Sequence, residues 1–381
     1  MKHPLINRRD FLGCGLLASG AAVASSRSLS EGRWESEPNP LPPAYTVIPV
    51  VGDGRWIWNV PPTNQTGYLE PRWYSLQVGI EIESRGSLSG VLATTPVPID
   101  CPEQKLNEEQ VKTSGCEAHV RQLAPYSRQL VLAAEDLAPG QTVSATAVYN
   151  LTEYKQYQNY QRDQFAPAQK VSADVRQAYL GDSTGIQTRA PQVRALLKKL
   201  VPETLHPWDQ ARRFADWVRA NIKPQIGPYT SVLAALENLR GDCEEMSAVF
   251  VALCRAAGIP ARIVWVPNHN WAEFYLVDEH DQGHWIPVHT ACYHWFGWTG
   301  AHELVLQKGD RVTAPEKATS YRLVKDWMQW QGRKPQVRYW AELEPLPPPD
   351  GKDAGPGARR KIETGEWQLI AKHSADRYMR R

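Results

Sequence analysis

The chain has 381 residues, of which 42% are hydrophobic and 22% charged, and its formal net charge is +2. This length and composition allow two domains, each with a hydrophobic core. The nearly balanced charge argues against nucleic acid as a partner and against a sustained attraction to an anionic membrane.

The first 24 residues resemble an export signal. Asn7-Arg8-Arg9-Asp10-Phe11-Leu12 is similar to a twin-arginine motif, a mild apolar stretch follows, and Ala22-Val23-Ala24 fits a small-x-small cleavage site. The apolar stretch is too short for a spanning helix. We therefore expect a signal peptide over 1–24, a periplasmic or extracellular location, and no transmembrane segment in the mature form. The alternatives are an uncleaved membrane anchor and a chance arginine pair.

Short strands dominate the first half of the chain. Residues 25–44, rich in Ser, Pro and Glu, predict a flexible linker, and 45–151 predicts an all-β sandwich. Apolar residues alternate with polar ones from Tyr74 to Ile82, as in a half-buried strand. Further strands are expected at Val47–Val51, Gly90–Ile99, Gln129–Ala134 and Thr142–Leu151.

Helical spacing begins after a polar segment over 152–190, which we interpret as a linker or as a segment that covers a neighbouring domain. Apolar stripes predict helices near 193–200, 211–222 and 232–239, and helices followed by strands make 191–310 an α+β domain. Residues 311–381 are interpreted as a C-terminal extension, partly flexible. The extension includes a possible strand at Val337–Leu343 and is expected to pack on the domain before it.

The segment from Gly241 to His289 carries the candidate chemistry. Cys243 opens an apolar helical stripe that stops at Gly258-Ile259-Pro260, so its thiol lies in the first helical turn. The helix dipole lowers a thiol pKa there, although the neighbouring acidic residues oppose this effect. His269 opens the next predicted strand. A cysteine nucleophile with a histidine base is therefore the favoured interpretation.

These residues resemble the transglutaminase-like superfamily, which has a papain-like Cys-His fold. The matching elements are Gly-x-Cys, Arg-x-x-Gly-Ile-Pro-Ala-Arg, His-x-Trp-x-Glu and Trp-x-Pro-x-His, spread over roughly 190–310. The resemblance implies that Cys243 is the nucleophile and His269 the base. Secreted relatives often carry an immunoglobulin-like β domain ahead of the catalytic one, which agrees with the strand-rich first half.

His289 stands where the family has an aspartate. A neutral histidine can accept a hydrogen bond from His269 but brings no negative charge. Either Cys243, His269 and His289 form a working variant triad, or the site is degenerate and only binds. Asp278 and Asp281, in the loop between the two strands, are alternative orienting residues.

Other features leave alternatives open. Trp295 and Trp298 follow the last catalytic strand and are expected either to wall a substrate cleft or to pack in the core. Cys101 and Cys116 can pair in an oxidising compartment or stay free. The histidines near the site match no standard zinc spacing, so we expect neither a metal nor another cofactor.

The sequence predicts an exported, thiol-dependent acyl-transfer enzyme that hydrolyses or transamidates a peptide or amide bond. Its partner would be a peptide or protein substrate, for example one in the cell envelope. The alternative is a catalytically degenerate module that binds a peptide or glycan.

Overall fold

The computed structural model describes residues 45–47, 56–58 and 66–349, except for 124–125, 203, 226–227, 268, 292–294, 301 and 318. For 45–47 and 56–58, which form the paired strands β1 (Tyr45–Val47) and β2 (Trp56–Trp58), only the backbone is described. The predicted leader, the whole predicted linker 25–44 and the last residues of the chain lie outside the described residues.

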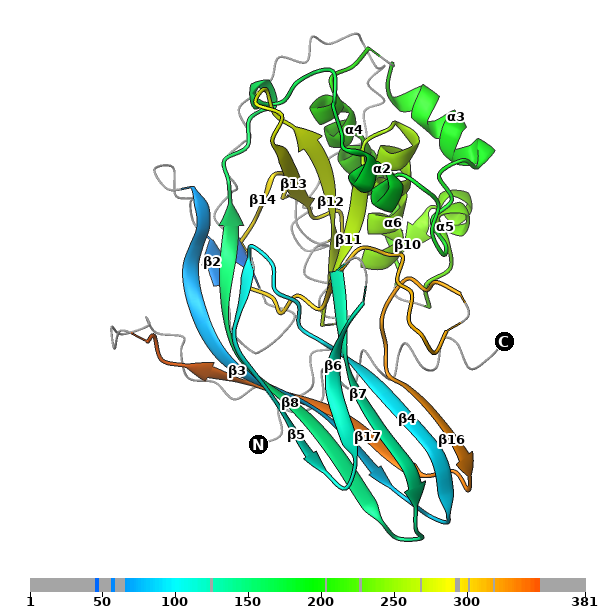
Figure 1. Cartoon of the computed structure of the whole chain (residues 1–381). Coiled ribbons are helices and arrows are strands. Elements are labelled where there is room, and N and C mark those ends of the chain that lie inside the picture. Colours follow the sequence, from blue (N-terminus) through cyan, green and yellow to red (C-terminus); the bar gives the residue numbers. More distant parts are fainter. Residues whose placement is uncertain are drawn as a thin grey trace.

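Two antiparallel sheets pack face to face in the lower half of Figure 1. One has the order β16-β4-β7, with β6 beside β7; the other has the order β17-β3-β8, with β5 beside β8. The strands are β3 (Gly67–Glu83), β4 (Leu88–Val97), β5 (Gln104–Ser114), β6 (Glu117–Leu123), β7 (Tyr126–Leu137), β8 (Thr142–Tyr157), β16 (Trp327–Gly332) and β17 (Gln336–Leu346). This arrangement is consistent with the sandwich expected over 45–151.

The alternation noted in the sequence places the sandwich core. Leu76, Val78, Ile80 and Ile82 of β3 point inward and are at most 1% exposed. They meet inward-facing residues of β4 and β7, such as Val91 and Leu132, in one cluster. Residues of period two on both sheets thus bury a common apolar layer.

The sandwich is completed by strands from the far end of the chain. β17 pairs with β3 along its whole length, and β16 pairs with β4. The expected C-terminal extension over 311–381 is therefore wrong for Trp327–Leu346, which belongs to the sandwich and not to the surface of the preceding domain. Hydrogen bonds to strands far away in the sequence leave no local trace from which this could be predicted.

The segment between β8 and β16 is a mixed layer of helices and strands, inserted into the sandwich. Its helices are η1 (Arg162–Gln164), α2 (Ala173–Tyr179), α3 (Pro191–Leu200), α4 (Pro207–Asn221), α5 (Val232–Asn238) and α6 (Cys243–Ala256). Its strands are β9 (Lys223–Pro224), β10 (Arg240–Gly241), β11 (Ala261–Val266), β12 (His269–Val277), β13 (Gly283–Val288), β14 (Trp298–Thr299) and β15 (Gln307–Lys308). The chain is thus α+β, as predicted.

Helix α6 lies at the centre of this segment and packs on β11 and β12 (Figure 1). Phe250 on the helix meets Phe274 on β12 with ring centroids 6.2 Å apart. The helix stops at Gly258, whose φ of +83° is a left-handed conformation that glycine adopts without strain. The helix predicted from the apolar stripe after Cys243 is therefore confirmed.

The two parts of the chain share one sheet. Short strand β15 pairs with β11 on one side and β7 on the other, which gives the continuous order β13-β12-β11-β15-β7-β4-β16. The predicted linker 152–190 also needs correction, because β8 runs on to Tyr157 and α2 occupies Ala173–Tyr179. None of the described helices is long and apolar enough to cross a membrane.

Candidate active site

Cys243 is the first residue of α6, and its surroundings moderate the negative charge of its neighbours. The Asp242 side chain caps the helix by accepting from the Glu244 N–H at 2.8 Å. Glu244 pairs with Arg322 at 2.5 Å, while burial and Asp242 raise the pKa of Glu245. The ion pair of Glu244 and the raised pKa of Glu245 both reduce the negative charge near Cys243. The acidic neighbours therefore repel a thiolate less than the sequence alone predicts.

The first two residues of β12 lie beside this helix end. Asn270 donates from Nδ2 to the Cys243 sulfur at 3.5 Å, and His269 is its neighbour in the strand. Cys243, His269 and Asn270 are 6%, 4% and 3% exposed, so the site is enclosed. The sequence analysis missed Asn270, and its only signal is its position directly after the predicted base.

His289 directly follows β13, the strand that pairs with β12, which begins at His269. The two imidazole rings have centroids 5.9 Å apart, and the His289 ring stacks on Trp271 at 5.1 Å. Its Nε2 lies 3.2 Å from the Thr299 hydroxyl oxygen. Arg219 donates to the His289 carbonyl oxygen at 2.6 Å and holds this turn from α4. The structure therefore places the predicted third residue beside the predicted base.

Electrostatics keep His289 neutral. Burial, the adjacent His269 and the Arg219 guanidinium together lower its pKa well below the ordinary value of 6.5. A neutral ring has one donor and one acceptor nitrogen, so it can accept a hydrogen bond at ordinary pH. This is the protonation state that an orienting role requires.

The alternative orienting residues are engaged elsewhere. Asp278 lies 2.8 Å from His284 Nε2, and this hydrogen bond lowers the pKa of the Asp278 carboxyl. Asp281 forms an exposed ion pair with Lys170 at 3.3 Å. Both contacts lie in the loop at the other end of β12 and β13 from His269 and His289. His289 is therefore the better placed candidate.

Trp295 packs against His289, and Trp298 packs against Trp295. They are 1% and 3% exposed, and the Trp295 ring meets the His289 ring nearly edge-on with centroids 4.8 Å apart. Trp298 lies on β14, which pairs with β8 of the sandwich. The expected substrate-binding role of the two tryptophans stays a prediction, because in this structure they line the inside of the protein.

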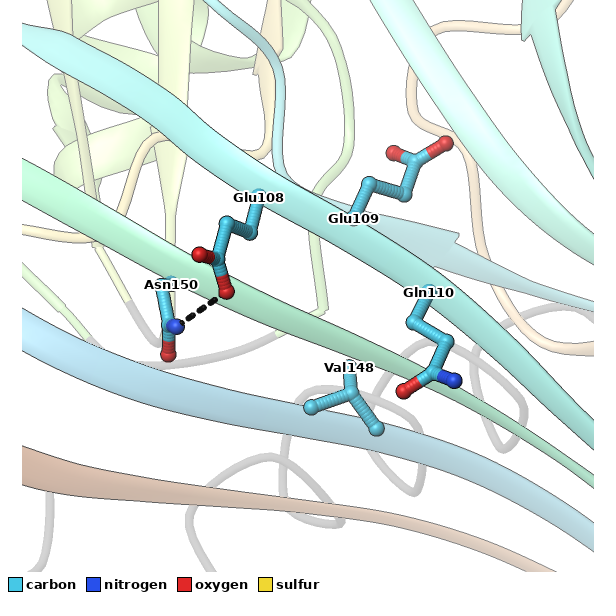
Figure 2. A pocket seen from close by; sticks show the side chains of 5 residues that line it. All are labelled: Glu108, Glu109, Gln110, Val148 and Asn150. Carbon is cyan, nitrogen blue, oxygen red and sulfur yellow. Dashed lines mark hydrogen bonds between the residues drawn. The ribbon is translucent and has the colours of Figure 1, made fainter.

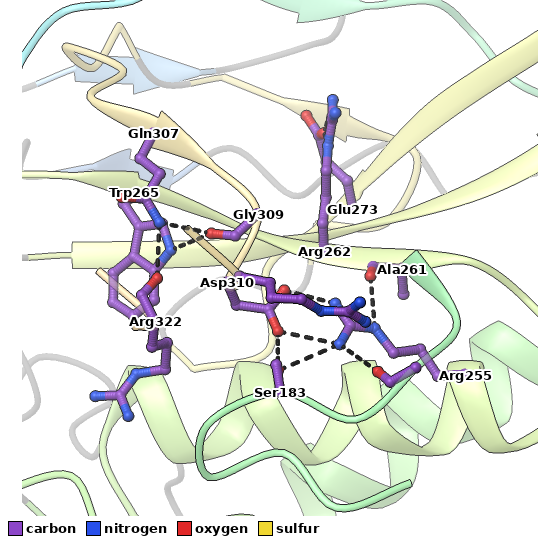
Figure 3. A network of polar contacts seen from close by, with 12 residues as sticks. Ser183, Arg255, Ala261, Arg262, Trp265, Glu273, Gln307, Gly309, Asp310 and Arg322 are labelled. Carbon is purple, nitrogen blue, oxygen red and sulfur yellow. Dashed lines mark hydrogen bonds and ion pairs between the residues drawn. The ribbon is translucent and has the colours of Figure 1, made fainter. Parts of the chain in front are cut away.

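Buried ion pairs lie on both faces of the sheet that contains β11 and β12 (Figure 3). On the helix side, Arg255 at the end of α6 binds Asp310 through both guanidinium nitrogens, at 2.5 and 3.0 Å. Ser183 also hydrogen-bonds Asp310. These contacts fix the far end of the helix that carries Cys243.

On the opposite face, Arg262 of β11 pairs with Glu273 of β12 at 2.7 Å. Glu273 also accepts from Lys308 at 2.9 Å, and Lys308 reaches Glu103 of the sandwich side at 2.5 Å. The ammonium and guanidinium groups lower the pKa of Glu273, although its burial opposes this. This network joins the strand of His269 to the sandwich.

Outside the thiol site, the described residues form a hollow on the sandwich but no metal-binding cluster. The hollow in Figure 2 is lined by residues of β5 and β8, including Glu108 and Asn150, which supply no part of the thiol site. Among the described residues, no three His, Cys, Asp or Glu side chains are placed to hold a metal. Cys101 and Cys116, which the sequence allowed to pair, are both free thiols.

The thiol at the start of α6 contacts Asn270, and the imidazoles of His269 and His289 lie at neighbouring ends of β12 and β13. Residues 194–290 match the transglutaminase-like superfamily. This segment, which contains Cys243, His269 and His289, is therefore a transglutaminase-like domain.

Two solved structures show weak similarity. One is a candidate cysteine protease from Cytophaga hutchinsonii, with 16% identity over 78% of this chain and 97% of that chain, at a TM-score of 0.46. The other is a candidate protease from Parabacteroides distasonis, with 8% identity over 57% of this chain and 48% of that chain, at a TM-score of 0.23. No curated protein matches the sequence.

Proposed function

We propose that the protein is an exported, thiol-dependent acyl-transfer enzyme that acts on a peptide or amide bond. The observation that carries this proposal is the meeting of three elements: Cys243 at the start of α6, the His269-Asn270 end of β12, and His289 beside His269. Its export and cell-envelope substrate rest on the leader motif alone.

Each residue has a distinct role in the proposed reaction. The Cys243 thiolate adds to the carbonyl carbon, and the Cys243 N–H at the helix start donates to the oxygen that becomes negative. His269 takes the thiol proton and returns it to the leaving amine. Neutral His289 orients His269. Water as the second substrate gives hydrolysis, which we favour beyond the cytoplasm because water is the most abundant acceptor.

A binding module is the second candidate, and the enclosure of the site favours it. Cys243 is only 6% exposed, and no carboxylate stands at the third position. In this alternative the domain keeps its fold, and a peptide or glycan binds without turnover.

Alkylation of the intact protein by iodoacetamide separates the two candidates. Cys243 should react fastest, because an ion-paired thiolate persists well below the pH at which a free thiol ionises. Burial raises the pKa of Cys254 and of Cys101, which serve as internal references in the same mass spectrum. His269→Ala should slow Cys243 by about tenfold or more near neutral pH, since each unit of thiol pKa changes the thiolate fraction tenfold.

His284→Ala is the matched control, because His284 lies on β13 and contacts Asp278 instead of the thiol site. It should leave alkylation of Cys243 unchanged. Equal rates in wild type and His269→Ala would reject the ion pair and favour the binding module.

A further inference from the structure

Asn270 is the polar side chain that faces the thiol from the strand. It lies on the same face of β12 as Ala272 and Phe274, which pack against the catalytic helix. Its Nδ2 lies 3.5 Å from the Cys243 sulfur. An amide oxygen in this place would repel a thiolate, so the nitrogen is the end expected to face the sulfur.

The other end of the Asn270 amide is buried without a partner among the described residues. The side chain is 3% exposed, and Oδ1 makes no hydrogen bond there. A buried acceptor that lacks a partner costs roughly 1–3 kcal/mol. This cost is explained if the amide is kept for a group that arrives with the substrate, such as an N–H of a peptide.

We propose that Asn270 is a catalytic residue whose side-chain N–H donates to the oxyanion formed on the substrate carbonyl, opposite the Cys243 N–H. This inference rests on the proposed function. The oxyanion is bonded to the same carbon as the attacking sulfur, so a donor within reach of the sulfur is also within reach of that oxygen. Asn270 thus supplies the second donor of a two-donor oxyanion hole.

The bonds change as follows. The thiolate forms a carbon–sulfur bond, and the carbonyl π electrons move onto oxygen, where both donors stabilise the negative charge. When the carbonyl re-forms, the bond to the leaving group breaks, and an amine leaves with the proton held by His269. The acyl group stays on Cys243 until water or an amine removes it.

Two small reagents test this proposal, and their size suits an enclosed thiol. p-Nitrophenyl acetate acylates cysteine through a tetrahedral oxyanion and releases p-nitrophenolate. Iodoacetamide alkylates the same sulfur by displacement of iodide, with no oxyanion. The measured quantity is the ratio of the two second-order rate constants at Cys243, followed by p-nitrophenolate absorbance and by the mass of the Cys243 peptide.

Asn270→Ala should lower acylation by about 10- to 1000-fold, the range expected for loss of one oxyanion donor. Alkylation should change by less than about threefold. Asn270→Asp keeps the side-chain shape but loses the donor, and should lower the ratio as well. It also serves if the alanine variant does not fold. Ser247→Ala is the control, because this buried serine on α6 contacts Thr290 and not the thiol.

Three results would overturn the proposal. An unchanged ratio in both Asn270 variants would remove the oxyanion role. An equal fall in both rate constants would mean that Asn270 acts on the thiol itself and not on the oxyanion. A wild-type Cys243 that reacts with neither reagent faster than free cysteine would reject the proposed function, and this proposal with it.

Discussion

His289→Asn tests how much of the acid sensitivity of the fold comes from one buried imidazole. Because the folded state lowers the pKa of His289 below 6.5, the unfolded chain binds the proton more readily than the native one. The free energy of unfolding must then fall as pH drops below about 6.5. Above that pH, the stability that depends on a neutral His289 is fully present. One such group gives a slope of up to about 1.4 kcal/mol per pH unit, down to the folded pKa.

Urea unfolding at several pH values between 7.5 and 5 measures this slope. The His289→Asn protein should lack the part of the slope that His289 contributes. The free energies of unfolding of wild type and variant, plotted against pH, should therefore converge by up to about 1.4 kcal/mol for each pH unit below 6.5. Any constant offset between the curves reports packing against Trp271 and not the proton. Buried His302, whose pKa is also lowered, contributes equally to both proteins. Parallel curves would refute the reasoning that burial and two neighbouring groups hold His289 neutral.

Two further substitutions test the contacts around the site. Thr299→Val keeps the side-chain shape but removes the hydroxyl next to His289. Turnover of p-nitrophenyl acetate should fall by roughly 10- to 10⁴-fold, while the circular dichroism spectrum stays unchanged. Unchanged turnover would show that Thr299 has no part in orienting the His289 ring. Glu273→Gln leaves buried cations without their partner and should lower the free energy of unfolding by about 3–5 kcal/mol. Glu81→Gln, in an exposed pair, should cost no more than about 1 kcal/mol, and similar costs for both would contradict the assigned burial.

Local patterns predicted the centre of the site. The apolar stripe after Cys243 predicted α6, and alternation after His269 predicted β12. Both signals depend on residues that are neighbours in the sequence, where period and side-chain direction are tied together. His289 was singled out by the resemblance to the transglutaminase-like superfamily and not by local pattern. The antiparallel pairing of β12 and β13 then brings the end of β13 close to the start of β12.

Contacts between distant parts of the chain were not predictable in the same way. Thr299 reaches His289 because β14 pairs with β8, and nothing in either short segment indicates its partner. Lys308 gives no sign in the sequence that it joins Glu273 to Glu103. The tryptophans Trp295 and Trp298 show the same limit, since composition does not tell whether an aromatic ring faces a cleft or the core.

The return of β16 and β17 to the sandwich makes the segment from η1 to β15 an insertion between β8 and β16. A ribosome therefore releases the whole inserted segment before the chain can close the sheets around β3 and β4. A chain truncated after Asp310 would leave β3 and β4 with open edges, which favour pairing between chains. Design of a minimal active fragment should accordingly keep residues up to Leu346, however far they lie from the thiol.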